Sequence, residues 1–112
     1  MALLTTQTIV LTGLNPAYTA VAASDTFVAH ERAHLHVKNA GGSPDSCVIQ
    51  VQGGDPPGLM LSDNTVSVTN GQERMIGPLP AQFFNNGTTG VATVTHSFTT
   101  SVTSGVFQLQ YP

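Results

Sequence analysis

The clearest pattern in the chain is an alternation of apolar and polar residues in two neighbouring segments near its middle. Leu35 and Val37 alternate with polar residues in the first segment, and Ile49 and Val51 do so in the second. A period of two places successive side chains on opposite faces of a β-sheet. Residues 39–45, NAGGSPD, are rich in turn formers. The pattern therefore predicts a β-hairpin, which needs further strands around it to be stable in water.

Shorter alternating or β-branched runs predict the remaining strands, and no segment keeps a helical period. Asn70-Gly71 is the strongest hairpin signal in the chain. The further strands are expected at residues 7–14, 26–29, 65–69, 73–77, 91–98 and 105–111. About eight short strands with frequent turns indicate an all-β fold, an antiparallel β-sandwich of jelly-roll or Ig-like type.

The apolar positions of these strands predict the core. A pair of phenylalanines, Phe83 and Phe84, lies in a short connector and is expected to cover one open end of the sandwich. Cys47, the only cysteine, shares a strand face with Ile49 and is expected to be a buried, unreactive thiol. Asp25 and Asp45 are expected in turns. The predicted core comprises Leu35, Val37, Ile49, Val51, Val66, Val68, Val94, Phe107 and Leu109.

The length of 112 residues fits a single domain at residues 7–112, preceded by an arm at residues 1–6. The arm begins with apolar residues, so we expect Leu3 and Leu4 to order against a neighbouring subunit. The alternative is that these residues are only the frayed start of the first strand. The N-terminal segment lacks the pattern of a signal peptide or membrane span, so synthesis in the cytoplasm is expected.

Charge is scarce in this sequence. Only 8% of the residues are charged, against about 25% in an average soluble domain. With a net charge of −3 and three basic residues, a surface that binds nucleic acid is not expected. A surface of neutral hydroxyl and amide groups instead lowers the desolvation cost of docking against other proteins.

His30, His34 and His36 form the only cluster of metal-ligand type in the sequence, and on a strand His34 and His36 share one face. Only Glu31, in a connector, stands near them as a third ligand, so no metal or other cofactor is expected. We expect the two histidines to face solvent or a neighbouring subunit. No paired acid and base, GxSxG turn or phosphate loop is present, which argues against an enzyme. A cupin-like metalloenzyme that uses both histidines remains a minor alternative.

Three blocks of sequence carry a resemblance to a known family. They are Leu35–Ala40 with the glycine-rich turn after it, Val66–Pro80, and the Phe83-Phe84-Asn-Asn-Gly87 segment before the last valine-rich strands. Over residues 25–110 the chain resembles small β-sandwich head proteins of tailed bacteriophages, which are similar in fold to capsid decoration, or cement, proteins. The resemblance implies a trimer on the outer capsid surface of the virion that bridges major capsid protein subunits, without membrane contact or catalytic residues.

Two functional hypotheses follow from the residues and the resemblance together. The first is a capsid decoration protein that stabilises the shell by binding its assembled state. The alternative is a virion-borne recognition module that binds a host-surface glycan or protein through residues 53–58 and 85–89. The residues expected at an interface are Leu3, Leu4, His34, His36, Met75 and Phe83.

Overall fold

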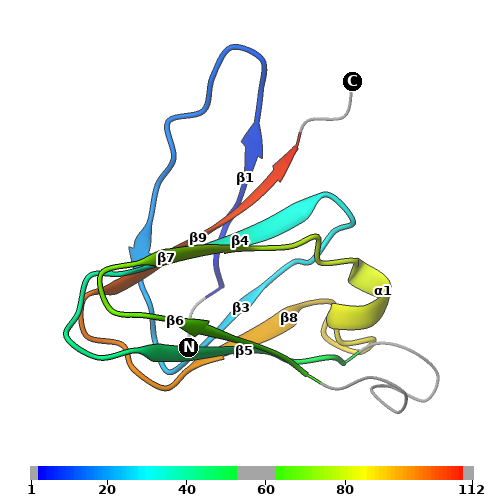
Figure 1. Cartoon of the computed structure of the whole chain (residues 1–112). Coiled ribbons are helices and arrows are strands. Elements are labelled where there is room, and N and C mark those ends of the chain that lie inside the picture. Colours follow the sequence, from blue (N-terminus) through cyan, green and yellow to red (C-terminus); the bar gives the residue numbers. More distant parts are fainter. Residues whose placement is uncertain (1–2, 53–62, 110–112) are drawn as a thin grey trace.

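The computed structural model describes residues 3–52 and 63–109, which form two β-sheets packed face to face (Figure 1). One sheet has the strand order β1-β9-β4-β7, with β2 also paired to β9, and the other has the order β3-β8-β5-β6. All pairs are antiparallel except β1 with β9. The predicted all-β sandwich is therefore confirmed. The elements are β1 (Thr6–Ile9), β2 (Thr19–Ala20), β3 (Ser24–Phe27), β4 (Ala33–Asn39), β5 (Asp45–Ile49), β6 (Asn64–Val68), β7 (Glu73–Ile76), α1 (Ala81–Phe84), β8 (Ala92–His96) and β9 (Val102–Leu109).

The two predicted hairpins are wrong. The strands β4 and β5 lie in different sheets, and so do β6 and β7, so both turns carry the chain from one sheet to the other. Asn39, which is buried, ties the two crossings together. Its Nδ2 donates to the carbonyls of Ser43 and Val68, and its own carbonyl accepts from the backbone N–H of Gly71. Alternation reveals which face of a strand is buried, but it does not reveal the strand that pairs with it.

Most of the predicted core is buried, with three departures. Leu35, Val37, Ile49, Val68, Val94 and Phe107 are buried, as is Cys47. Val51 and Val66 are only half-buried, and Leu109 is 54% exposed. The face of β9 was predicted the wrong way round: Val102 and Val106 face the second sheet, so Phe107 and Leu109 lie on the outer face. Phe107 is buried there against Tyr18 and His34, whereas Leu109 stays exposed. The expected strand residue Tyr111 and the loop at residues 53–58 lie outside the described residues.

The first described residues belong to the sandwich. Leu3 forms a β-bridge with Thr26, and the N–H of Leu4 donates to the Thr26 carbonyl at 2.7 Å. Leu4 is buried in the core cluster, whereas Leu3 is 64% exposed. Leu4 therefore packs within its own domain rather than in a free arm, as the alternative of a first-strand start implies.

Two aspartates expected in turns lie on strands and are buried. Asp45 Oδ2 lies 2.6 Å from His96 Nδ1, and both side chains are fully buried. Asp45 Oδ1 accepts from the backbone N–H groups of Ser97 and Phe98. The carboxylate thus joins the start of β5 to the turn after β8. Asp25 likewise lies on β3, where it accepts from the N–H of Ala22.

Candidate interaction surface

The outer face of the first sheet gathers three of the six predicted interface residues. On β4 the apolar side chains face the core, so His34 and His36 lie on the opposite face. The register pairs His36 with Met75 of β7, and His34 with Phe107 of β9. The two histidines therefore point away from the core, as predicted, although both are half-buried rather than fully exposed.

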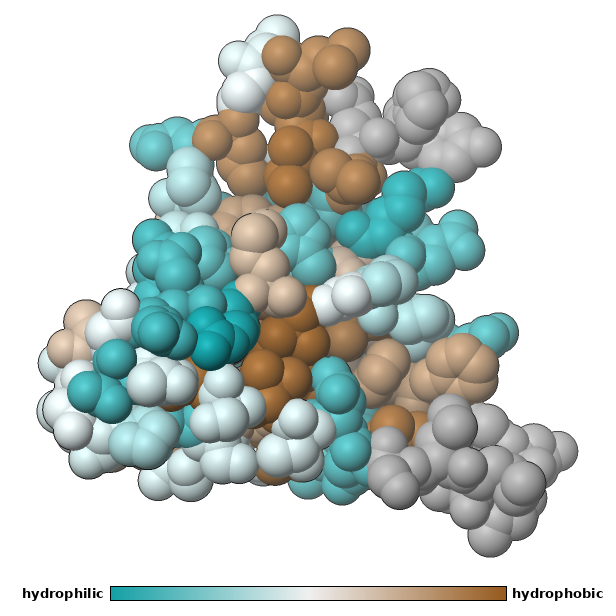
Figure 2. All heavy atoms as spheres, in the orientation of Figure 1, coloured by the Kyte–Doolittle hydropathy of each residue, from teal (hydrophilic) through white to brown (hydrophobic). Residues whose placement is uncertain are grey.

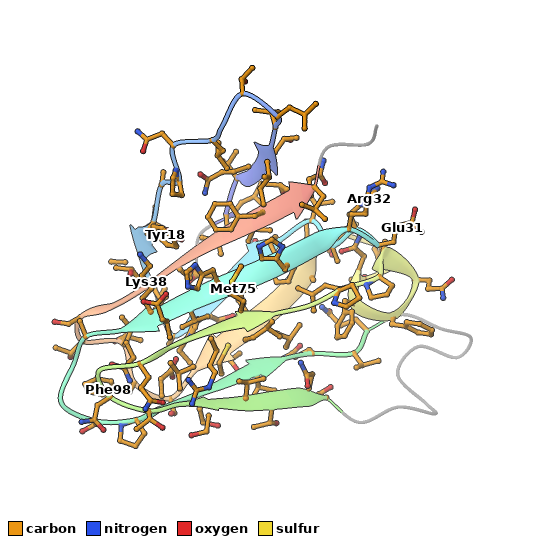
Figure 3. The ribbon with its side chains drawn as sticks, turned by 45° about the horizontal axis from the view of Figure 1, so that its top comes forward. Tyr18, Glu31, Arg32, Lys38, Met75 and Phe98 are labelled. Carbon is orange, nitrogen blue, oxygen red and sulfur yellow. The ribbon has the colours of Figure 1, made fainter. Side chains whose placement is uncertain are left out.

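Tyr18, labelled in Figure 3, packs against His36 on this face. The Tyr18 hydroxyl lies 2.7 Å from His36 Nδ1, and the two rings meet edge to face at 5.3 Å. Tyr18 also contacts Phe107, and Lys38 Nζ lies 4.0 Å from the centre of its ring. Four contacts therefore hold the chain before β2 onto the sheet. The sequence carries no signal for this role of Tyr18, because the residues around it show no clear periodicity.

His36 connects this overlying chain to the far strand of the sheet. Its Nε2 lies 2.8 Å from Glu73 Oε1 on β7. An ionised carboxylate only accepts hydrogen bonds, so Nε2 carries a proton and donates to Glu73. In the neutral ring, Nδ1 then accepts from the Tyr18 hydroxyl. Both ring nitrogens are used in positioning, which leaves neither of them free to act as a base.

His34 belongs to the apolar part of the same face. Its ring stacks on Phe107 with 5.6 Å between the ring centres. Burial lowers the pKa of His34 below its usual value, and the neighbouring His36 lowers the pKa further. His34 is therefore neutral at pH 7 and acts as a flat, weakly polar platform beside Met75.

The segment between β1 and β2, residues 10–18, projects beyond the sandwich (Figure 1). Gln7 closes its base, because its side-chain amide both donates to the Ala17 carbonyl and accepts from the Ala17 N–H, at 2.8 Å each. A turn at Gly13, with φ of 96°, reverses the chain and bonds to the Val10 carbonyl. The projection is therefore held at its base, at its turn and at Tyr18.

This projection carries the most exposed large apolar side chain of the described residues, Leu11, at 102% exposure. Figure 2 shows hydrophobic atoms gathered on this upper part of the molecule. We define the apolar crest as Ile9, Val10, Leu11, Leu14 and Leu109. Below it, a hollow of about 270 Å³ lies between the projection and the sheet, lined in part by Leu14, Tyr18, His34, His36 and Met75.

A second hollow, of about 330 Å³, continues this surface past Leu109 and Met75 to Glu31 and Arg32. Met75 is 65% exposed and lines both hollows. Glu31 and Arg32, labelled in Figure 3, lie at the end of β4 away from Lys38. The surface therefore has an apolar centre with charged side chains at its rim, which is the anatomy of a protein–protein interface.

The other predicted interface residues lie elsewhere. Leu3 is at the edge of the sandwich beside β3, and Leu4 is in the core. Phe83 lies on α1 and is 37% exposed, while Phe84 packs against the core. The expected end cover is thus formed by Phe84. Figure 1 shows α1 at the end of the sandwich opposite β2, so Phe83 does not join the crest.

Residues 85–89, which the recognition hypothesis expects to contact a ligand, form hydrogen bonds within the domain through their side-chain amides. The Asn85 side chain accepts from the Ala29 N–H and donates to the Ala29 carbonyl. Asn86 Oδ1 accepts from the N–H groups of Thr88 and Thr89. These bonds stabilise the turn and leave fewer groups for a ligand.

Neither a membrane-crossing helix nor a metal site is found within residues 3–52 and 63–109. No helix there has the length and apolar character to cross a bilayer. No three or more His, Cys, Asp or Glu side chains gather there in a way that could hold a metal ion. Comparison of the chain with protein-family models, with curated proteins and with solved structures gives no match.

Proposed function

We propose that the chain is a capsid decoration protein of a tailed bacteriophage. In this proposal it binds the outer surface of the head as a homotrimer, contacts the major capsid protein through the apolar crest and stabilises the shell. The observation that carries the proposal is the crest itself, a projecting apolar surface with Leu11 fully exposed at its tip. The resemblance of the sequence to small head proteins supplies the partner.

The crest has the energetic properties that such contacts need. Burying an exposed leucine or methionine contributes about 1.5–3 kcal/mol, so Leu11 and Leu109 of the crest, and Met75 beside it, can act as anchors. The bonds of Gln7 and Tyr18 already hold the projection in place, so little conformational entropy is lost on docking. Contacts repeated over a closed shell gain further strength from multivalency.

The buried and bonded state of the histidines also supports a binding role over catalysis. Both ring nitrogens of His36 are engaged with Tyr18 and Glu73. The Asp45–His96 pair is the most acid–base-like couple of the described residues, but both side chains have no exposed surface for a substrate. A general base must lie within hydrogen-bonding reach of the proton that it removes.

The test measures binding of the purified full chain to empty capsids of the parent phage that lack it. Leu11→Asp is expected to weaken binding by roughly tenfold or more, because a charge would be buried at the centre of the contact. Thr12→Asp, one residue away and also exposed, is the matched control and should bind within about twofold of the parent. Both variants should keep the parent's unfolding midpoint.

Two results would contradict the proposal. One is failure of the parent chain to bind capsids at any concentration tested while it binds host cells or surface polysaccharide, which is the behaviour of a recognition module. The other is equal capsid binding by Leu11→Asp and the parent. Sedimentation of the free chain as a monomer at micromolar concentration would contradict the trimer alone.

A further inference from the structure

A third cavity, of about 440 Å³, lies at the edge of the sandwich where two strands meet the same neighbour. Thr6 of β1 pairs with Val106 of β9, and Thr19 of β2 pairs with Ser104. Gly105 therefore lies between the ends of the two ladders. We call this opening the edge cavity. Its volume falls within the roughly 300–1,000 Å³ typical of small-molecule sites.

The frame of the edge cavity is well defined. On one side the chain before β1 is bonded to the other sheet through Leu4 and Thr26. On the other side the Gln7–Ala17 bonds join β1 to the chain that leads into β2. A side chain at position 105 would place its Cβ 2.9 Å from the Ala17 carbonyl oxygen, so glycine lets the chain pass this close to β9. The cavity is thus built into the fold.

Ser104 contributes a buried hydroxyl to the lining of the edge cavity. It lies between the core residues Val102 and Val106 on alternate positions of β9, so its side chain faces the space between the sheets. It is 1% exposed, and its Oγ has no hydrogen-bond partner among residues 3–52 and 63–109. A buried hydroxyl without a partner is costly, which makes a partner from a bound molecule favourable.

The chemistry of the lining selects the ligand. Its side chains are aliphatic or neutral and include Leu3, Leu4, Gln7, Thr19 and Val106. An ion would lose its hydration there without gaining a counter-charge. We propose that the edge cavity binds a small uncharged molecule that is mostly aliphatic and has one hydrogen-bonding group, which pairs with Ser104 Oγ. This site is separate from the crest and does not depend on capsid binding.

The probe for this proposal is hexan-1-ol, titrated into the isotope-labelled full chain and followed by amide chemical shifts in two-dimensional NMR. Saturable shifts are expected at residues 4–7, 19–20 and 104–106. Hexanoate and hexylammonium, which have the same chain length but carry a charge, should bind at least about tenfold more weakly. This comparison separates a built neutral site from general adhesion of alkyl chains.

Two variants test the two parts of the site. Ser104→Ala removes the hydroxyl and should weaken hexan-1-ol binding roughly five- to tenfold. Thr19→Leu should abolish saturable binding, because Thr19 is the cross-strand partner of Ser104, shares its face and is exposed enough to accept a larger side chain. Thr103→Ala is the matched control, since this neighbouring hydroxyl points to the opposite face of β9 and does not line the cavity.

The proposal is overturned by any of three results. These are the absence of saturable shifts with hexan-1-ol in the parent, equal binding of the charged probes, and unchanged binding by Ser104→Ala. Thermal unfolding of each variant checks that it is folded. If Thr19→Leu does not fold, Ser104→Ala alone decides, because it removes a hydroxyl that has no bond to lose among the described residues.

Discussion

Replacing Asp45 by alanine removes the acceptor of three hydrogen bonds in the interior of the second sheet. The carboxylate accepts from the backbone N–H groups of Ser97 and Phe98 and is paired with His96. Leaving a buried donor without an acceptor costs about 1–3 kcal/mol, so the loss of this shared acceptor should cost about 3–5 kcal/mol in all. Because domains are typically stable by only about 5–15 kcal/mol, this single change should remove a large part of the free energy of unfolding.

Asp45→Asn removes the carboxylate but keeps the size and shape of the side chain. The asparagine oxygen can still accept from Ser97 and Phe98, while its NH₂ group would face His96 Nδ1. His96 must then carry its proton on Nε2, which is buried and has no partner among the described residues. Leaving a buried N–H unpaired costs about 1–3 kcal/mol, so Asp45→Asn should fall between alanine and the parent.

The assay is equilibrium urea unfolding of the parent and both variants, followed by circular dichroism. The matched control is Asp63→Ala, because Asp63 also accepts from a backbone N–H, that of Val51, but is exposed. The control should lose no more than about 1 kcal/mol. A loss below about 1 kcal/mol for Asp45→Ala, or equal losses for Asp45→Ala and Asp63→Ala, would refute the reasoning that the buried carboxylate staples β5 to the turn after β8.

Three further predictions concern other parts of the sandwich. Leu4→Ala should lower the unfolding free energy by about 2–5 kcal/mol because Leu4 lies in the core. An unchanged urea midpoint would show that Leu4 belongs to a free arm instead. Burial, and to a smaller extent the neighbouring Asp45, raises the pKa of Cys47 to about 12. Cys47 should therefore not react with a thiol reagent in the native chain but should react in urea, and fast labelling of the native chain would contradict this. The lowered pKa of His34 means that the unfolded state binds more protons near pH 6, so stability should fall as the pH drops below 6.5 and level off below the folded-state pKa. His34→Gln should reduce that fall, and an identical pH profile in both proteins would argue against the burial of His34.

The alternation of the chain was sufficient to predict the inner and outer faces of β4, β5 and β6, but on β9 apolar residues occupy both faces and the predicted inner face, with Phe107 and Leu109, is the outer one. Leu35, Val37, Ile49 and Val68 are buried as their period of two predicts. The same period places Asp45 on the inner face with Cys47, a signal that was available but was outweighed by the frequency of aspartate in turns. Local pattern is reliable here because side-chain direction alternates in every extended strand, whatever the strand pairs with.

The pairing of the strands was decided only by the tertiary structure. Both turn-rich segments, at residues 39–45 and around Gly71, look like hairpin turns, yet each crosses between the sheets. The crossing depends on the buried residue Asn39. Its side-chain amide donates to the carbonyls of Ser43 and Val68, and its backbone carbonyl accepts from the N–H of Gly71 in the second turn. A contact across such a sequence distance leaves no periodic trace in the chain.

The candidate interaction surface was likewise predictable from the sequence only in part. The period of two was enough to place His34 and His36 together on the outer face of β4, and Met75 was expected at an interface without a partner strand to fix its direction. The register of β7 against β4 turned Met75 outward beside His36, and the folding of residues 10–18 over the sheet brought Tyr18 and Leu11 to the same surface. The sequence determines side-chain direction strand by strand, whereas the neighbours that surround each side chain depend on which distant segments pack together, and that is a property of the whole fold.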